Sequence, residues 1–272
     1  MPPPPYIRNF QYCSVIEQKV NPKTGEKFLA DRDGTPVERI ITDTGMNSFA
    51  YPDGRIATDF MERVTDSVSG KRYYATKTGN LSSVTTILGE TGDKTLLDQW
   101  RARVGDVEAE RIRKEATGLG SLMHTHLENY IMGEARPTGN NLVRKMAAGM
   151  SDVIIECGLS NLNEVWGMEE GLYFPHLYAG TADLIGVYRG KPAIIDYKSA
   201  KKIKKEEIIE DYFLQGAAYI LAHNELFGTN IATVVILMVD RDYKFKEFIA
   251  TGHTFNKYME RWLDRFHTFH SR

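Results

Sequence analysis

Cysteine is scarce in this sequence. Two cysteines, Cys13 and Cys157, occur among 272 residues, far apart and outside any Cys-x-x-Cys pattern. This scarcity excludes a disulfide framework, a cysteine-rich zinc site and an iron–sulfur cluster held by four cysteines. Long hydrophobic runs are missing as well. The longest, residues 231–239, has the length of a strand, whereas a membrane-spanning helix needs about 20 apolar residues, so we expect no membrane contact.

An excess of charge of either sign is also missing. Lys and Arg number 34 against 36 Asp and Glu, which gives a formal net charge of −2. A protein that coats nucleic acid through bulk positive charge would be more basic, so any contact with DNA or RNA must use a local feature. The 42% hydrophobic and 26% charged residues are typical of a globular protein.

The amino-terminal residues 1–10 contain a proline run, with neither a hydrophobic signal core nor an Arg- and Ser-rich amphipathic leader. We therefore expect a cytoplasmic protein. The absence of an organelle leader favours a phage-infected or bacterial cell over a mitochondrion.

Two parts of the chain differ in pattern. Residues 1–80 are rich in turn pairs such as Asn21-Pro22 and Thr78-Gly79, which predicts an accessory region of hairpins and loops. Residues 81–272 begin with apolar residues at helical spacing. We expect four helices there: 84–88 with Ser82 or Ser83 as its cap, one from about residue 96 that Gly118 and Gly120 end, 121–132 and 142–157.

The pattern then changes to strands, predicted at 168–174, 179–188, 192–197, 231–239 and 244–249. A helix over 206–227 separates the third strand from the fourth, and an amphipathic helix over 253–270 follows the fifth. This order predicts a mixed α/β fold with a helical wall over residues 94–157, a core over 165–250 and a terminal helix.

Two aspartates and a lysine come together in one predicted hairpin. A turn at Arg189-Gly190 joins the second and third strands and places Asp183 opposite Asp196 on one face. Lys198 follows two residues later on the same face. Opposed carboxylates in an apolar setting need compensation, which a divalent cation supplies. The cluster suits metal-dependent phosphodiester hydrolysis, with the lysine stabilising charge or orienting a water.

A structural interpretation of the same hairpin stays open. The aspartates can lie in water at frayed strand ends, and Lys198 can simply begin a loop. A register slip of one residue would put Asp183 and Asp196 on opposite faces of the sheet.

Two helices add polar groups to this picture. His124 and Glu128 lie one turn apart on one helical face, so the carboxylate can orient an imidazole that binds a metal. Gln215, one turn before Tyr219, interrupts an apolar stripe and could order a bound water or a phosphate. Taken singly, these residues are better explained as a satisfied core histidine and a glutamine at the solvent edge.

Lysines follow the hairpin directly, in a stretch free of acids that spans residues 198–205. Lys201 and Lys202 lie where backbone phosphates beside such a site would need neutralising. The alternative is a solvated surface, because acids at residues 206–211 nearly cancel this charge.

At these residues the sequence resembles a known family. Asp183, followed by Asp196-Tyr197-Lys198, resembles the D…(D/E)-x-K signature of the PD-(D/E)XK nuclease superfamily. The Gly-x-x-x-His motif that ends at His124 and the Gln-x-x-x-Tyr motif from Gln215 resemble flanking motifs of its RecB-like branch. Within that branch, the resemblance is greatest to the mitochondrial genome maintenance exonucleases and related phage exonucleases, and it covers about residues 80–250.

This resemblance implies a restriction-endonuclease-like core, with a central mixed sheet flanked by helices and an amino-terminal β-rich extension. It also implies roles for individual residues. The expected metal ligands are His124, Asp183, Asp196 and the Tyr197 carbonyl, and the expected catalytic residue is Lys198. The residues expected to support the site are Glu128, Glu170, Gln215 and Tyr219, with Glu170 binding the metal through water. The residues expected to contact DNA are Ser83, Ser199, Lys201 and Lys202.

The implied activity is that of a Mg²⁺- or Mn²⁺-dependent DNA exonuclease without an iron–sulfur cluster. We expect it to act on single-stranded ends in phage or bacterial replication, recombination or degradation of DNA. The alternatives are a structure- or site-specific endonuclease on the same fold, and a non-catalytic nucleic-acid-binding recombination partner.

Overall fold

The computed structural model describes residues 15–30, 34–41, 47–50, 56–57, 59–67 and 70–272. The proline run at residues 1–10 lies outside them. The first described elements are strands: β1 (Val15–Val20), β2 (Lys27–Ala30), β3 (Glu38–Ile41), β4 (Asn47–Ala50), β5 (Ile56–Ala57), β6 (Asp59–Thr65), β7 (Arg72–Thr76) and β8 (Gly79–Ser83). Four helices follow: α1 (Val84–Thr91), α2 (Thr95–Val104), α3 (Asp106–Met132) and α4 (Leu142–Cys157).

The second half of the chain holds the core strands. After a short 3₁₀ turn, Leu159–Asn161, the elements are β9 (Leu162–Phe174), β10 (Tyr178–Tyr188), β11 (Lys191–Ala200), a 3₁₀ turn at Glu206–Ile208, α5 (Glu210–Phe227), β12 (Thr233–Asp240), β13 (Phe245–Thr251) and α6 (His253–His270). All five strands expected in this half are confirmed, as are the helices at 142–157 and 253–270.

Ten of the described strands form one mixed sheet. Its order is β13-β12-β11-β10-β8-β7-β6-β1-β2, and β9 pairs with β10 off this path. The β11–β12 and β8–β10 pairs are parallel, whereas β9–β10, β10–β11 and β12–β13 are antiparallel. The predicted mixed α/β fold is therefore confirmed, and strands β6–β8 from the amino-terminal region continue its central sheet.

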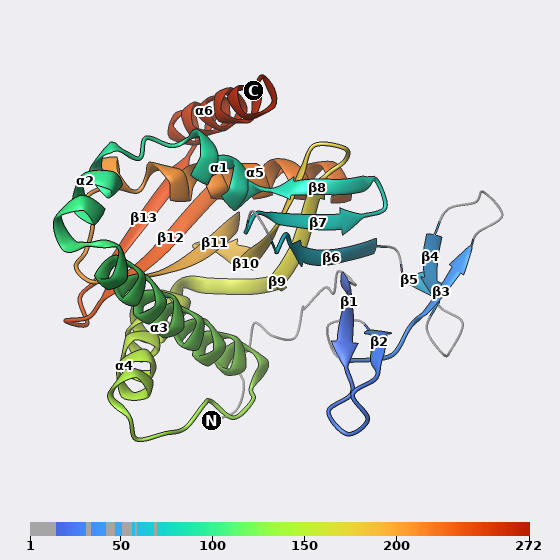
Figure 1. The fold of residues 1–272 in the computed structure, drawn as a ribbon, viewed down its shortest axis with the longest axis horizontal. Coiled ribbons are helices and arrows are strands. Elements are labelled where there is room, and N and C mark those ends of the chain that lie inside the picture. The colour runs from blue at the N-terminus through green and yellow to red at the C-terminus, as the bar shows by residue number, and fades with distance from the viewer. Residues whose placement is uncertain (1–14, 31–33, 42–46, 51–55, 58, 68–69) are drawn as a thin grey trace.

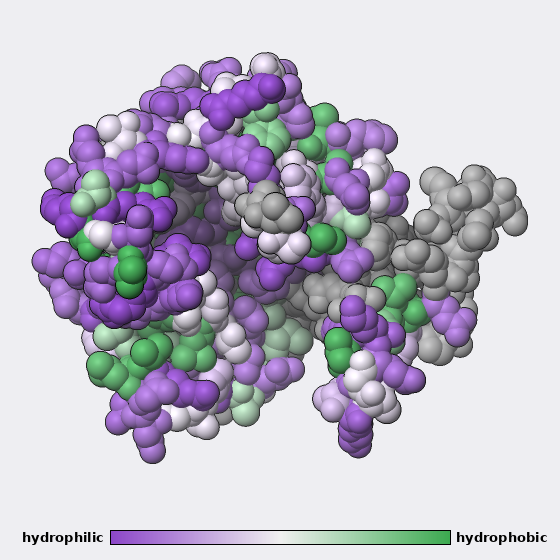
Figure 2. All heavy atoms as spheres, viewed as in Figure 1, coloured by the Kyte–Doolittle hydropathy of each residue, from purple (hydrophilic) through white to green (hydrophobic). Residues whose placement is uncertain are grey.

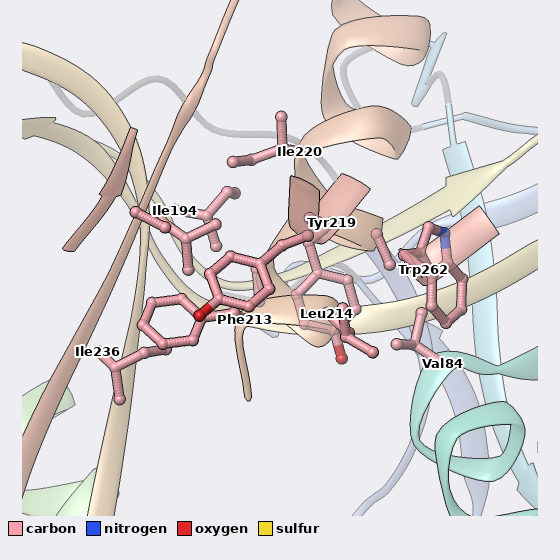
Figure 3. Close-up of a cluster of buried hydrophobic side chains, with 14 of the residues drawn as sticks. Val84, Ile194, Phe213, Leu214, Tyr219, Ile220, Ile236 and Trp262 are labelled. Carbon is pink, nitrogen blue, oxygen red and sulfur yellow. The ribbon is translucent and has the colours of Figure 1, made fainter. Parts of the chain in front are cut away.

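Helices pack on both faces of this sheet (Figure 1). On one face, α3 and α4 contribute Met123, Leu127 and Ile154 to a core that includes Ile195 and Leu237 of the sheet. On the other face, α1, α5 and α6 bury a second core, shown in Figure 3. The hairpin β10–β11 therefore has a helix-covered apolar layer on each side.

The second core is organised by aromatic residues. Trp262 of α6 is fully buried and meets the Tyr178 ring edge to face at 5.0 Å between centroids. Phe213 of α5 stacks on Tyr258 of α6 at 4.5 Å. Full burial of a large apolar side chain is worth about 1.5–3 kcal/mol. These rings therefore attach α5 and α6 firmly to the sheet.

The prediction that Gly118 and Gly120 end a helix is wrong. Both lie inside α3, and the break falls at Gly105, whose φ of 84° lies in the left-handed region that favours glycine. A Cβ on Gly120 would lie 3.2 Å from Ser199 Oγ. Gly120 therefore lets α3 approach β11 closely, which explains why a residue of low helix propensity is found inside a long helix.

The helix predicted over 206–227 is also shorter than expected. Its first turn is a separate 3₁₀ segment, and α5 begins at Glu210. None of the helices in the described part of the chain is long and apolar enough to cross a membrane.

Candidate active site

The central sheet splits at the predicted aspartates. The β10–β11 ladder runs from the hairpin turn to the pair Leu184–Ile195, which is the register that the Arg189-Gly190 turn predicts. Beyond that pair, β10 turns to β8 while β11 stays beside β12. Asp183 and Asp196 lie at this split. Asp183 Oδ2 accepts a hydrogen bond of 2.9 Å from the backbone N–H of Tyr197, which fixes its carboxylate across the gap.

A third carboxylate reaches the split from β9. In the β9–β10 ladder Glu170 pairs with Ala182 and Met168 pairs with Leu184, so Glu169 lies opposite Asp183. Glu169 adopts a φ of 48°, which interrupts the regular strand geometry. Its Oε1 lies 3.8 Å from His124 Nδ1. Sequence analysis missed Glu169. The signal was the tight turn over residues 175–177, from which a count along both strands places residue 169 opposite residue 183.

The predicted role of Glu170 stays a prediction. The structure brings its neighbour Glu169 to His124, and Glu170 itself is 2% exposed and pairs with Ala182 in the ladder. Strand alternation explains the difference, because adjacent strand residues leave the backbone in opposite directions.

His124 of α3 faces the strands. Its Nε2 donates a hydrogen bond of 3.1 Å to the Tyr197 carbonyl, and its Nδ1 lies 3.8 Å from Asp183 Oδ2. The ligand atoms of His124, Glu128 and Glu169 lie within 4.8 Å of one another, a spacing that suits a metal ion. Glu128 is therefore placed as a possible ligand itself, in addition to its predicted role of orienting the imidazole.

Asp196 and Lys198 form a buried ion pair. Lys198 Nζ lies 2.6 Å from the Asp196 carboxylate, and the side chain of Asp196 is 6% exposed. Burial, followed by the charge of Asp183, raises the pKa of Asp196 to about 6, although Lys198 opposes this shift. Burial acts against the charge of Lys198, but Asp196 and Asp183 together raise its pKa above the usual value, so Nζ keeps its proton.

The site carries more negative charge than its cations neutralise. Burial disfavours protonated His124, but the charge of Asp183 and the nearby Glu169 outweigh it and raise the pKa of His124 to about 9. His124 thus holds a proton at a place where a bound metal cation would reduce the same repulsion between the carboxylates. Carboxylates, a backbone carbonyl and an imidazole are ligands that Mg²⁺ and Mn²⁺ accept, so the residues present fit the expected divalent ion.

An aromatic ring beside the lysine was not predicted. The ring of Tyr212 on α5 lies 4.9 Å from Lys198 Nζ and 5.1 Å from Lys204 Nζ, and its hydroxyl accepts a hydrogen bond of 2.8 Å from Lys204. Such cation–π contacts favour the charged ammonium. Tyr212 therefore restricts where the Lys198 side chain can lie.

Gln215 and Tyr219 also lie at the split. Gln215 Nε2 donates a hydrogen bond of 3.1 Å to the Tyr219 hydroxyl. The buried Tyr219 ring lies against Gly180 of β10, where an added Cβ would be 2.5 Å from a ring carbon. Burial and the charges of Asp183 and Asp196 raise the Tyr219 pKa, so the phenol stays neutral.

An open pocket of about 710 Å³ gives access to this cluster. It lies between Thr85 at the start of α1 and the face of α3 that carries His124, and Lys198 and Ser199 line it too. Figure 2 shows it as a hydrophilic hollow.

The predicted DNA-contacting residues differ in exposure. Ser83 is 1% exposed, and its hydroxyl accepts a hydrogen bond of 3.0 Å from the Thr86 N–H. Of the two caps that the sequence offers, Ser82 and Ser83, it is therefore Ser83 that caps α1, and Thr85 is the exposed hydroxyl beside it. Lys201 and Lys202 are exposed next to the pocket-lining Ser199.

No protein-family model matches this chain. It is 26% identical over 271 residues to mitochondrial genome maintenance exonuclease 1 of Xenopus tropicalis, a match that covers 93% of this chain and 74% of the frog protein. Among solved structures, a candidate exonuclease from Eubacterium rectale matches 57% of this chain with a TM-score of 0.43 and 14% identity; the match spans 64% of that structure, less than two thirds of its length.

Proposed function

We propose that this chain is a DNA exonuclease of the PD-(D/E)XK superfamily that uses Mg²⁺ or Mn²⁺ and acts on single-stranded ends. One observation carries the proposal. Asp183, Asp196 and Lys198 lie together where β10 and β11 part, and His124 of α3 faces them. The similarity to mitochondrial genome maintenance exonuclease 1, with its 93% coverage of this chain, supports the same activity.

Different residues of the site would have different roles in the reaction. Asp183, Asp196, the Tyr197 carbonyl and His124 would hold the ion, with Glu169 and Glu128 beside them. When bound, the ion polarises the phosphate oxygens. Asp196 fixes Lys198 by their 2.6 Å contact, and the protonated Nζ places positive charge where negative charge develops on the reacting phosphate. Gln215 and Tyr219 keep the α5 side of the site in place.

The preference for single-stranded ends rests on the helical wall. The access pocket lies between α1 and α3, so a strand must pass along the wall to reach Lys198. The exposed lysines Lys201 and Lys202 lie beside this path and would neutralise backbone phosphates. We assign the activity to replication, recombination or degradation of phage or bacterial DNA.

Digestion of labelled DNA tests this function. Linear single- and double-stranded DNA, labelled at the 5′ or the 3′ end, is incubated with Mg²⁺ or Mn²⁺ beside closed circular single-stranded DNA. We expect metal-dependent loss of linear single strands and intact circles. Cutting of the circles would show that the protein is a structure- or site-specific endonuclease and not an exonuclease. No digestion by the folded wild type with either metal would favour a non-catalytic nucleic-acid-binding protein.

A further inference from the structure

A second, smaller pocket of about 270 Å³ lies next to the access pocket. Its walls are α3, the loop after β11 and the turn between β12 and β13. Ser199 lines both pockets, so the two are neighbours along the same surface. Of its lining residues, the function proposed above uses Lys201.

The pocket has an apolar floor and a charged rim. We call its apolar lining residues the floor: Ile112, Ala116 and Leu119 of α3, and Ala200. Arg111, Lys201 and Arg241 lie at the rim, with Glu108 and Glu115. Apolar surface framed by a few placed polar groups is the usual composition of a small-molecule site. Here it suits a ligand with one flat apolar part and one anionic part.

The two rim arginines are held in place before any ligand binds. Glu115 accepts hydrogen bonds from Arg241 at 2.8 Å and from Arg111 at 3.2 Å, which connects α3 to the β12–β13 turn. The Asp240 carboxylate accepts from the backbone N–H groups of Ile203, Asp242 and Lys244. These bonds tie the loop that carries Lys201 to the turn that carries Arg241. Binding therefore costs little ordering of the protein.

We propose that this pocket binds one unpaired nucleotide of the substrate strand, adjacent to the phosphate that reacts at Lys198. The base lies on the Ile112 and Ala116 floor, and its phosphate meets Arg241 and Lys201. This inference rests on the proposed nuclease function. A pocket of about 270 Å³ is too small for a base pair, so the nucleotide that it takes is unpaired.

Two variants test the floor and the rim separately. Ala116→Trp fills the pocket without changing charge, and Arg241→Gln removes one rim cation. Both are made in a Lys198→Met background that blocks cleavage, and the dissociation constant of a fluorescent oligo-dT strand is measured by anisotropy. We expect each variant to weaken binding about tenfold, as loss of one charge-assisted or packed contact predicts.

Salt dependence distinguishes the two effects. The slope of log affinity against log salt should fall by about 0.7 for a lost single-strand phosphate contact in Arg241→Gln, and stay unchanged in Ala116→Trp. A blunt duplex should bind equally weakly to all variants, since a base pair does not enter the pocket.

The controls use the same chemistry away from the pocket. Arg113→Gln removes an exposed arginine of α3 that pairs with Glu110, and Ala102→Trp places a tryptophan on exposed α2. Both should bind oligo-dT like the Lys198→Met parent. If the pocket variants match these controls while the wild type digests single strands, the pocket assignment is overturned and the nuclease stands. If the wild type digests no DNA but the pocket variants alone lose binding, the pocket stands and the nuclease fails.

Discussion

Asp183 Oδ2 accepts a 2.9 Å hydrogen bond from the backbone N–H of Tyr197, one residue beyond the aspartate that faces it across the hairpin. This bond spans the point where β10 and β11 separate. A regular ladder would have used the same N–H for a strand partner. Here the Tyr197 N–H orients the Asp183 carboxylate instead. The separation of the two strands therefore frees the backbone donor that positions this side chain.

Loss of the lysine should lower the activity strongly. Lys198→Met keeps the length and apolar contacts of the side chain but removes the charge beside the reacting phosphate. We expect the turnover number on single-stranded DNA to fall at least about 100-fold. Lys191→Met, at the exposed start of the same strand, is the matched control. An active Lys198→Met enzyme that unfolds at the wild-type temperature would contradict the assignment.

Adjacent glutamates should respond differently to metal. Because Glu169 Oε1 lies 3.8 Å from His124 Nδ1, Glu169→Gln should raise the Mn²⁺ concentration for half-maximal activity at least about tenfold, as loss of a group at a metal site commonly does. Glu170→Gln should leave that concentration near the wild-type value. The opposite ranking in a metal titration would support the role that the sequence predicts for Glu170.

Gly180 should tolerate no side chain. An alanine Cβ there would lie 2.5 Å from a carbon of the Tyr219 ring and 2.8 Å from its hydroxyl. Displacing the ring should lower the free energy of unfolding by about 1–3 kcal/mol and disturb the Gln215 contact.

A second glycine provides the comparison in urea unfolding. Gly89→Ala meets no atom within 4 Å and lies in α1, so it should be neutral or stabilising by up to about 1 kcal/mol. Equal stability of the two alanine variants would show that Tyr219 does not require the close approach.

His223 should make the fold sensitive to acid. Burial lowers its pKa to about 4, against about 6.5 in an unfolded chain. Above pH 6.5 the imidazole is neutral in both states. Between pH 6.5 and 4 the unfolded chain binds a proton that the folded chain does not, so the free energy of unfolding falls as the pH falls, by up to about 3 kcal/mol.

Urea unfolding at several pH values measures this loss. His223→Gln should flatten the curve between pH 4 and 6.5, because glutamine does not titrate and can keep the contact to Thr229 that is 2.7 Å long in the wild type. His253→Gln, at an exposed position, is the control that should retain the slope. Parallel curves of unfolding free energy against pH for wild type and His223→Gln would show that a group other than His223 causes the acid sensitivity.

Local sequence signals predicted much of the fold. A change from helical spacing to runs of strand length marked the five core strands, the Arg189-Gly190 pair set the hairpin register, and Ser83 was one of two candidate helix caps. Each of these depends on residues close together in the chain. Gly118 and Gly120 misled the prediction because glycine inside a helix costs only about 1 kcal/mol. The close approach of Ser199 to Gly120 belongs to a distant strand and is invisible in the local pattern.

Taken by itself, the sequence determined the chemistry available: two aspartates and a lysine on one hairpin, with a histidine on a helix. Only the tertiary structure decided which groups join them. Glu169 lies at the site because it adopts a left-handed conformation on β9, and Tyr212 lies there because α5 packs on the sheet. The second pocket forms where α3 contacts the β12–β13 turn. The physical reason is that periodicity and turn chemistry act over a few residues, whereas a site is assembled by packing between elements far apart in the chain.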